Sequence, residues 1–460
     1  MDDRERHDEE HGLVERLGGE EVGQTSSIGQ VALASFIGTA IEWYDFFLYG
    51  TAAALIFGEL FFPEFSPLAG TLAAFSTYAV GFAARPLGGI VFGHFGDKIG
   101  RKSMLVLSLL IMGIATALIG FLPTYQTVGV LAPILLVLLR FCQGIGVGGE
   151  WGGAVLMAVE HAPPGRRGFY GSWPQMGVPA GLLLGNLVFL GSTAVFPESW
   201  GWRVPFLLSF ILVGVGLFIG LRILESPAFL QVKESHTEAP MPILDVLRTY
   251  PKNVLLAMGM RIAENGTFYI STVFVLTYVV EQLKLEQSTA QLGVIIAAFI
   301  GLFTIPLFGA LSDRVGRRPL YLLGSGFALL FAFPFFWLLN SEVTILIWLA
   351  VILAVNVGHD AMYGPQAAFF SELFGTRVRY SGASLGYQLA SVLAGGLSPL
   401  IAVALLASYG YPAVAIYMAA MALITVISVI LATETYQEDI AETQVEERQL
   451  IGRGPEPEAR

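Results

Sequence analysis

The feature that most constrains this chain is a short, polar, glycine-rich stretch that occurs twice between long apolar runs. The first copy is GHFGDKIGRK at positions 93–102, and the second is GALSDRVGRR at positions 309–318. The interval from Asp97 to Asp313 equals the interval from Arg101 to Arg317. A polar hairpin repeated at a fixed offset in an apolar chain indicates two homologous membrane halves.

A second set of residues repeats at a similar interval and supports this division. Glutamate, arginine and serine at 160, 167 and 172 recur at 372, 379 and 384. We therefore expect the two halves to be related in parallel, with six helices in each.

The composition places the apolar runs in a bilayer. Only 13% of the 460 residues are charged, against about 25% in soluble domains, and the mean hydropathy is +0.67. The apolar runs are roughly 20 residues long, which is the length of a membrane helix. Because they are continuous rather than alternating, transmembrane strands are excluded. We predict an all-α membrane protein with twelve transmembrane helices in two pseudo-symmetric halves.

The net charge of −11 comes from the two ends of the chain. Residues 1–22 hold nine acidic and three basic residues, and residues 434–460 hold eight and three. Such segments are expected to be solvated and disordered, and they carry no information about a substrate. No cleavable signal peptide is evident, and the single cysteine, Cys142, allows neither an intrachain disulfide nor a cysteine-based metal site.

The expected spans follow the apolar runs, which glycine and proline punctuate as they do in membrane helices. The spans are 30–57, 69–95, 102–122, 129–158, 166–192, 203–223, 253–280, 289–311, 318–339, 343–370, 379–406 and 411–433. We divide the chain into a disordered acidic tail (1–28), an N-terminal bundle (29–224), a cytoplasmic linker (225–252), a C-terminal bundle (253–433) and a second disordered acidic tail (434–460).

Lysine and arginine decide the orientation in the membrane. With the N-terminus inside, the cytoplasmic loops hold fourteen basic residues and the opposite loops hold only Arg203 and Lys284. Positive residues remain on the cytoplasmic side, so both termini are expected there, in a multi-pass protein of the inner or plasma membrane.

The motifs of the chain resemble those of the major facilitator superfamily. They are EWYDFFLYG at 42–50, RPLGG at 85–89, the first polar hairpin, RFCQG at 140–144, GGEWGG at 148–153, LESPAFL at 224–230 and ELFGTRVR at 372–379. The resemblance is to the metabolite:proton symporter branch, close to the sugar-porter type. NVGHD at 356–360 and YSGASLGYQ at 380–388 look most like shikimate transporters.

This resemblance implies that the polar hairpins form a latch that closes the cytoplasmic gate. An aspartate there can reach the N-terminus of a neighbouring helix, and an arginine can reach a carboxylate across the bundle. The simpler alternative is topology alone, since inner loops are basic in any case. The expected gate residues are Asp97, Arg101, Lys102, Glu160, Arg166, Arg167, Glu225, Asp313, Arg317, Arg318, Glu372, Arg377 and Arg379.

Charged residues inside the spans are the sharper signal, because each costs a few kcal/mol unless it faces partners or water. They lie on spans 1, 4, 7 and 10, and the resemblance places these helices around a central cavity. The expected substrate-binding residues are Tyr49, Arg140, Gln143, Arg261, Glu264, His359, Asp360, Tyr363, Tyr387 and Gln388.

Some of these assignments have structural alternatives. Arg261 and Glu264 are three residues apart and can form a satisfied pair within one helix. His359 and Asp360 can be a second proton site rather than substrate contacts. Arg85 and Glu150 can anchor helix ends or join the cytoplasmic network, and they remain uncertain.

The expected proton-coupling residues are Asp45, Glu42 and Arg140. A carboxylate on span 1 paired with an arginine on span 4 matches the pattern of proton-linked sugar porters. Protonation that neutralises Asp45 frees Arg140 to bind a substrate carboxylate bidentately. Proton and anion then favour each other's binding, which is symport.

The predicted function is proton-coupled import of a small carboxylated metabolite, such as a shikimate-like hydroxylated cyclic acid or a dicarboxylate like 2-oxoglutarate. The alternatives are a proline/betaine-type osmolyte symporter, a proton-antiport exporter and a non-transporting membrane sensor. No enzyme, metal or cofactor is expected, with the proton as coupling ion. We expect a monomer in the lipid bilayer that binds an anionic small molecule and no nucleic acid.

Two motif matches are discounted. GIGVGG at 144–149 has dinucleotide-binding spacing but lies in a membrane span, where glycines serve helix packing. HDEEH at 7–11 has the spacing of a zinc motif but lies in an acidic tail.

Overall fold

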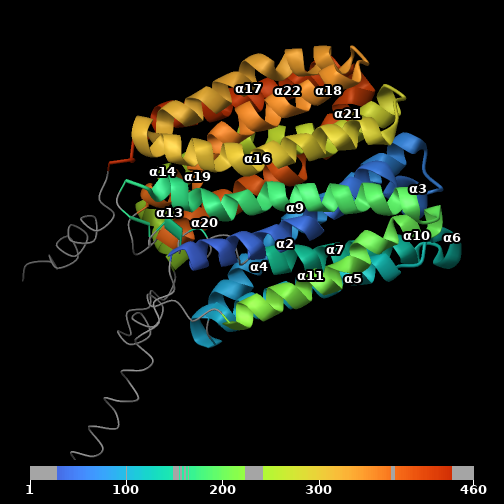
Figure 1. Cartoon of the computed structure of the whole chain (residues 1–460), viewed down its shortest axis with the longest axis horizontal. Coiled ribbons are helices and arrows are strands. Elements are labelled where there is room, and N and C mark those ends of the chain that lie inside the picture. The colour runs from blue at the N-terminus through green and yellow to red at the C-terminus, as the bar shows by residue number, and fades with distance from the viewer. Residues whose placement is uncertain are drawn as a thin grey trace, which may run out of the picture.

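The computed structural model describes residues 28–99, 101–148, 155, 158–159, 162–163, 165–222, 242–374 and 379–437, without the side chains of 93–105 and 379–381 among others. The described chain is helical almost throughout, and no strand occurs in these ranges. Its long helices run nearly parallel in one elongated bundle (Figure 1).

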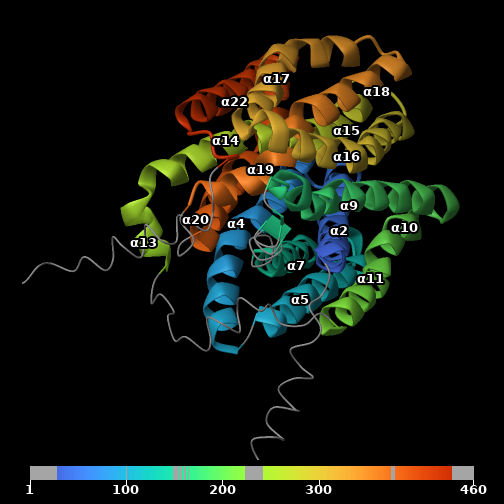
Figure 2. The ribbon, with the colours of Figure 1, turned by 60° about the vertical axis from the view of Figure 1, so that its left-hand side comes forward.

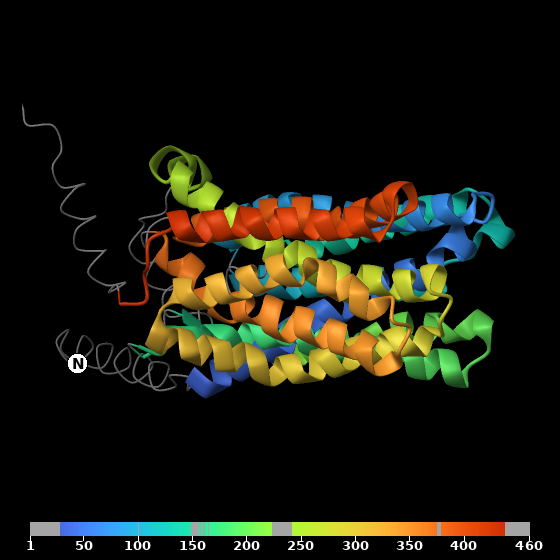
Figure 3. The ribbon, with the colours of Figure 1, turned by 90° about the horizontal axis from the view of Figure 1, so that it is seen from above.

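Six long helices form the N-terminal half, drawn blue to green in Figure 1. They are α2 (Ile28–Leu55), α4 (Pro67–Ile99), α5 (Arg101–Phe121), α7 (Leu131–Val147), α9 (Arg167–Val195) and α11 (Arg203–Arg222). Three short helices, α3 (Phe57–Phe61), α6 (Tyr125–Val128) and α10 (Glu198–Gly201), lie in the loops at one end of the bundle. The short helix α13 (Pro242–Thr249) lies at the opposite end (Figure 3).

The C-terminal half also has six long helical segments, and three of them contain π-helical turns. The seventh is α14 (Pro251–Tyr269), η1 (Ile270–Phe274), α15 (Val275–Thr277) and η2 (Tyr278–Gln282). The eighth and ninth are α16 (Gln287–Val315) and α17 (Arg317–Leu339). The tenth is α18 (Thr344–Ile352), η3 (Leu353–His359) and α19 (Asp360–Glu372). The last two are α20 (Arg379–Ala390) with η4 (Ser391–Gly396) and α21 (Ser398–Tyr409), and α22 (Tyr411–Leu431).

This architecture confirms the predicted fold class of two six-helix halves. Seven described helices are long and apolar enough to cross a membrane on length and composition alone. Prolines such as Pro86, Pro179 and Pro306 lie inside long helices, which membrane helices tolerate. The division into bundles, linker and tails stays a prediction, because much of the linker and most of both tails lie outside the described residues.

The two halves meet along their inner helices. Helix α9 packs against α16 and α19 (Figure 2). Helix α4 packs against η4 and α21. At the end of the bundle near α13, Gly168 and Gly309 bring α9 and α16 together so closely that a Cβ on Gly168 would lie 2.4 Å from the Gly309 carbonyl oxygen. Small residues allow such approaches between membrane helices.

The halves also touch in the middle and at the far end. The ring of Phe47 on α2 lies 5.8 Å from that of Phe268 on α14. Beyond it, the Thr277 hydroxyl donates to the Ala54 carbonyl at 3.1 Å, and the Thr71 hydroxyl donates to Glu281 at 3.0 Å. The two halves thus contact each other at both ends and in the middle of the described bundle.

Candidate functional site

Two buried arginines lie against one phenyl ring in the N-terminal half. Arg85 comes from α4 and Arg140 from α7, and each is at most 1% exposed. Their Cζ atoms lie 4.4 Å and 4.2 Å from the centroid of the Phe46 ring on α2. The Arg140 side chain passes α4 at Gly81, where a Cβ would lie 2.4 Å from its Nε atom. The glycine therefore leaves the room that the guanidinium occupies.

Aromatic rings complete the surroundings of both guanidinium groups. The rings of Trp43 and Phe82 each lie 5.0 Å from Arg85 Cζ, and those of Tyr49 and Tyr78 lie 4.2 Å and 4.8 Å from Arg140 Cζ. Cation–π contacts of this kind stabilise a buried cation without using its N–H donors.

The donors of the two arginines are only partly used within the described chain. Nη1 of Arg140 donates to Gln143 Oε1 at 3.0 Å, whereas Nε and Nη2 of both Arg85 and Arg140 have no hydrogen-bond partner there. Polar groups left unpaired in a protein interior are costly, so native structures rarely retain them without a reason. Two neighbouring guanidinium groups with open donors can together bind an anion.

The expected direct pair between Asp45 and Arg140 is wrong for this conformation. Within the described chain no ion pair joins them; instead, Asp45 accepts a hydrogen bond from Ser209 on α11 at 2.6 Å. The physical reason is that Asp45 faces α11, while the rings of Phe46 and Tyr49, from the same helix, stand against Arg140.

A polar route still connects the two groups. The amide of Gln143 accepts from Arg140 and donates to the Thr116 hydroxyl on α5 at 2.7 Å. Thr116 in turn lies beside the Asp45 carboxyl. Gln143 therefore lies between Arg140 and Thr116, and its role in substrate binding stays a prediction. Glu42 is buried one turn before Asp45 on the same helix. Tyr49 donates its hydroxyl to Thr77 at 2.7 Å.

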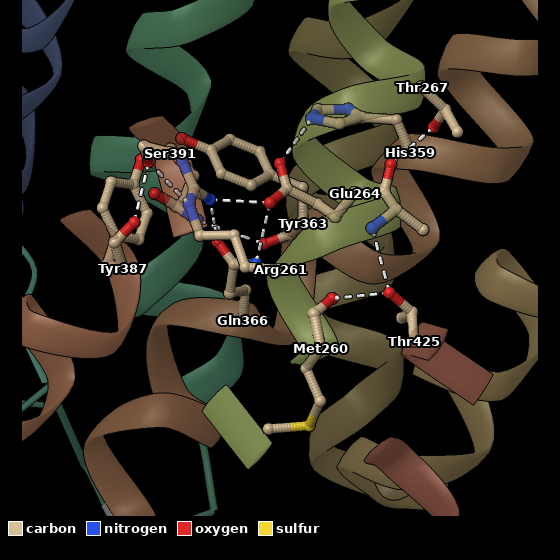
Figure 4. Close-up of polar contacts among 12 residues, drawn as sticks. Met260, Arg261, Glu264, Thr267, His359, Tyr363, Gln366, Tyr387, Ser391 and Thr425 are labelled. Atoms are coloured by element: carbon tan, nitrogen blue, oxygen red, sulfur yellow. Dashed lines mark hydrogen bonds and ion pairs between the residues drawn. The ribbon is translucent and has the colours of Figure 1, made fainter. Parts of the chain in front are cut away.

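The C-terminal half holds a second buried cluster, in which the charges are paired (Figure 4). Arg261 on α14 donates to Glu264 Oε2 at 2.6 Å, to Gln366 Oε1 at 2.9 Å and to the Ser391 hydroxyl at 3.1 Å. The ring of Tyr387 lies under the guanidinium, 3.2 Å from Cζ. The intrahelical pair that the spacing allowed is therefore present, and it is embedded in a wider network.

His359 connects this network to the tenth segment. Its Nε2 lies 3.1 Å from Glu264 Oε1, and its Nδ1 lies 2.8 Å from Asp360 Oδ1. The other oxygen of Asp360 accepts from Asn356 at 2.9 Å and from the Thr304 hydroxyl on α16. His359 and Asp360 are at most 2% exposed.

The remaining predicted binding residues lie around the same centre or beside it. Tyr363 packs on His359, with ring centroids 4.8 Å apart, and Tyr387 packs on Arg261. Gln388 instead donates to the Gly148 carbonyl oxygen at 3.4 Å, so it joins α20 to the end of α7 across the halves.

The C-terminal copy of the polar hairpin forms a buried charge cluster between the halves. Asp313 accepts from the backbone N–H groups of Gly168 at 2.7 Å and Phe169 at 2.9 Å, at the start of α9. Arg317 pairs with Asp313 at 2.8 Å and with Glu372 at 3.0 Å. A carboxylate at a helix N-terminus is favoured by the exposed donors and the helix dipole. This geometry fits a latch, and that role stays a prediction.

The segment after α22 adds to this cluster. Glu434 accepts from the backbone N–H groups of Arg317 at 2.9 Å and Arg318 at 3.0 Å, and Thr435 donates to Glu372 at 2.7 Å. Arg318 also donates to the last carbonyls of α22.

The N-terminal copy of the polar hairpin, at 93–102, lies among residues whose side chains are not described. Arg166 is exposed at the start of α9 and Arg167 is half-buried. The other predicted residues lie outside the described residues or have undescribed side chains, namely Asp97, Arg101, Lys102, Glu150, Glu160, Glu225, Arg377 and Arg379.

Sequence reasoning missed several polar partners. Ser209, Thr116, Thr304, Asn356 and Ser391 are neutral residues in apolar runs, and their contacts with the charged groups depend on helix rotation. The available signal was a hydroxyl or amide residue in an otherwise apolar span. The sequence does not decide whether Arg85 faces the cavity or anchors a helix end. In the structure it is buried beside Phe46, next to Arg140.

The helical bundle with buried charges between its halves defines a multi-pass membrane protein of the transporter class. The Major Facilitator Superfamily model matches residues 35–395. The chain is 45% identical over 415 residues to the shikimate transporter of Escherichia coli (strain K12), covering 88% of this chain and 94% of that one. It is 42% identical over 424 residues to the inner membrane metabolite transport protein YhjE of the same organism, covering 90% and 96%.

Two further comparisons bear on the family and the fold. The Escherichia coli (strain K12) proline/betaine transporter is 39% identical over 383 residues, covering 80% of this chain and 76% of that one. The solved proton:xylose symporter XylE, bound to 6-bromo-6-deoxy-D-glucose, matches the fold with a TM-score of 0.73 at 20% identity, over 91% and 98% of the two chains. The chain belongs to the major facilitator superfamily, so it is a transporter of small molecules and not an enzyme.

Proposed function

We propose that this protein imports a small carboxylated metabolite together with protons. The single observation that supports an anionic substrate is the pair of buried guanidinium groups, Arg85 and Arg140, which both lie against Phe46 and both have open donors. A carboxylate that reaches these donors would receive charge-assisted hydrogen bonds. Burial makes these bonds strong, because water does not compete for the donors.

The aromatic residues around the arginines favour a ring-shaped or partly apolar substrate. Trp43, Phe46 and Phe82 present faces and edges close to Arg85, which suits contact with a carbon ring next to a carboxylate. Shikimate-like hydroxylated cyclic acids therefore lead. They also agree with the relative named a shikimate transporter. Dicarboxylates such as 2-oxoglutarate come second, with one carboxylate for each guanidinium.

Proton coupling is assigned to Asp45, with Glu42 one turn before it. Thr116 and Gln143 lie between Asp45 and Arg140, so the charge of Asp45 acts on the anion site across a short row of polar side chains. Protonation of Asp45 removes a negative charge near the arginines and thereby favours a bound anion. By linkage, the anion then favours the proton to the same extent.

The inner gate is assigned to the cluster of Asp313, Arg317 and Glu372. It joins α9 of one half to α16, α17 and α19 of the other, so it must break when the cytoplasmic side opens. We place the protein as a monomer in the cell membrane with both termini in the cytoplasm, following the distribution of lysine and arginine.

An osmolyte such as proline or betaine is the second candidate. The similarity to the proline/betaine transporter favours it, and a zwitterion could place its cationic end near Glu42 or Asp45. A fully anionic substrate leaves those carboxylates free for protons, whereas a zwitterion engages one of them. The two candidates therefore predict different effects of carboxylate substitutions on binding.

The test is uptake into proteoliposomes of a labelled panel of shikimate, 2-oxoglutarate, proline and betaine. Each compound is offered with an inward acid gradient, without a gradient and with the gradient reversed. Concentrative uptake of an acid under the inward gradient alone supports the proposal. Uptake of proline or betaine only would favour the osmolyte reading, and gradient-driven efflux would show an exporter.

A further inference from the structure

Each carboxylate next to His359 has one oxygen that other donors already occupy. Oε2 of Glu264 accepts from Arg261 at 2.6 Å and from Gln366 at 3.0 Å. Oδ2 of Asp360 accepts from Asn356 at 2.9 Å and from Thr304. The remaining oxygens, Oε1 and Oδ1, face the imidazole.

The two imidazole nitrogens therefore face acceptors on both sides. A neutral imidazole has one N–H donor and one lone pair, and an ionised carboxylate has acceptors only. With a neutral ring and two ionised carboxylates, one lone pair would face a carboxylate oxygen inside the protein. The arrangement is satisfied only when one additional proton is present, either on the ring or on one of the two facing oxygens.

The charges of the surrounding groups lead to the same requirement. Arg261 and Glu264 balance each other, so Asp360 has no fixed cation among the described residues that face it. Besides these, the titratable groups around the ring are Tyr363 on α19, Tyr387 on α20 and Tyr321 on α17, the last through Gln366. Thr304 is the polar residue from α16. One proton brings the cluster to zero net charge, and its loss leaves a net charge of −1.

We propose that Glu264, His359 and Asp360 form a second proton-binding site, separate from Asp45, whose proton joins α14 to the tenth segment. His359 is the last residue of η3 and Asp360 the first of α19, so the bonds of the imidazole end at the junction of a π-helical and an α-helical turn. π-Helical turns of this kind are often found at functional sites.

Proton loss removes a donor from one of the two bonds, and this weakens the link between Glu264 and His359 or between His359 and Asp360. The proton leaves as H⁺ to water when the cluster is opened to solvent, and the site needs no co-reactant. A metal ion is not an alternative occupant: the ring nitrogens face carboxylate oxygens directly, and no metal-holding group of His, Cys, Asp or Glu occurs among the described residues.

The role in coupling rests on the proposed symport, but the presence of the proton does not. The chain has six histidines, so replacing the other five leaves His359 as the only one. This protein is labelled with ¹³C,¹⁵N-histidine, purified in lipid and measured at neutral pH by infrared and ¹⁵N magnetic resonance spectroscopy. We expect either a doubly protonated imidazole or a protonated carboxyl group.

Asp360→Asn and Glu264→Gln each replace a carboxylate, which only accepts, with an amide that can also donate to the imidazole, so the additional proton is expected to be lost at the same pH. Thr267→Val is the matched control on α14, because its hydroxyl donates to Ala263 and not to the cluster. It should leave the spectrum unchanged. A neutral imidazole with two ionised carboxylates in the protein that keeps only His359 would overturn the proposal, and that measurement needs neither carboxylate variant.

A second readout concerns stoichiometry. His359→Gln should lower the number of protons moved per substrate by one, measured from reversal potentials in proteoliposomes. An unchanged ratio with a protonated cluster would show that the site holds a proton without coupling it to transport. That result would overturn the coupling role and leave the transport function itself unaffected.

Discussion

The two halves handle buried charge in opposite ways. In the N-terminal half, Arg85 and Arg140 are held by aromatic faces and keep open N–H donors. In the C-terminal half, Arg261 uses its donors on Glu264, Gln366 and Ser391. Cation–π contacts stabilise a cation and leave its hydrogen-bonding capacity free, whereas an ion pair consumes it. Under the proposed function, the first half supplies open donors for an external anion, whereas Arg261 in the second half already has its partners within the chain.

The two halves also differ in the regularity of their helices. Among the described residues, all four π-helical segments belong to the seventh, tenth and eleventh segments, which are in the C-terminal half. The half with the closed polar network therefore also has the irregular helices.

The largest effect is expected from removing the proposed proton-binding carboxylate of the N-terminal half. Asp45→Asn should abolish uphill, pH-driven accumulation of substrate while leaving counterflow exchange, because the neutral side chain no longer alternates between charge states. Accumulation and counterflow are measured in the same proteoliposomes. Intact pH-driven accumulation in this variant would exclude Asp45 from the coupling mechanism.

The next prediction compares the replacement of a buried arginine by glutamine in the two halves. Arg140→Gln should weaken substrate binding about 30- to 150-fold, equivalent to about 2–3 kcal/mol for lost charge-assisted hydrogen bonds, with little change in stability. Arg261→Gln should mainly destabilise the fold, by about 3–5 kcal/mol, because Glu264 loses its buried partner. Calorimetric binding and thermal unfolding are measured for both. Equal loss of stability in the two variants would contradict the proposed difference.

A smaller effect is expected at the gate. Glu372→Gln removes the charge that Arg317 pairs with at 3.0 Å, and Thr435 also loses its charged acceptor. The closed inner side should become less favourable, and uptake should fall roughly tenfold, for about 1–2 kcal/mol. Accessibility of a cysteine placed at Ser172 to a membrane-impermeant reagent reports opening on the cytoplasmic side. Cysteine labelling that stays at the level of the parent protein would argue against the latch.

The smallest expected effect tests the aromatic support of Arg140. Tyr49→Phe keeps the ring 4.2 Å from Cζ and removes only the hydrogen bond to Thr77. Substrate affinity should change by less than about fivefold, in line with one neutral hydrogen bond of about 1 kcal/mol. Tyr49→Leu removes the ring as well and should cost more. If the two variants are equally weak, the cation–π contact contributes nothing.

Much of the fold could be predicted from the sequence, because it rests on local patterns. Apolar run length gives the spans, and the repeated hairpins give the two halves. The pair of Arg261 and Glu264 was accessible for the same reason, since residues three apart share a helical face.

The parts that could not be predicted depend on contacts between helices. Whether Asp45 faces Arg140 or Ser209 is decided by the rotation of α2 against α7 and α11, which no local pattern records. Arg85 could not be assigned because its surroundings come from α2 as well as from α4. The π-helical turns likewise follow from packing rather than from any residue pattern.

The residue at the position of Gly81 indicates whether a related sequence can hold both buried arginines in this arrangement. A methyl group at this position would coincide with the Arg140 guanidinium, 2.4 Å from Nε and 2.8 Å from Cζ. A homologue with a larger residue here would have to route its arginine elsewhere, and its cargo chemistry should differ. Under the proposed function, the residue at this position separates related transporters that can hold the two-arginine arrangement from those that cannot.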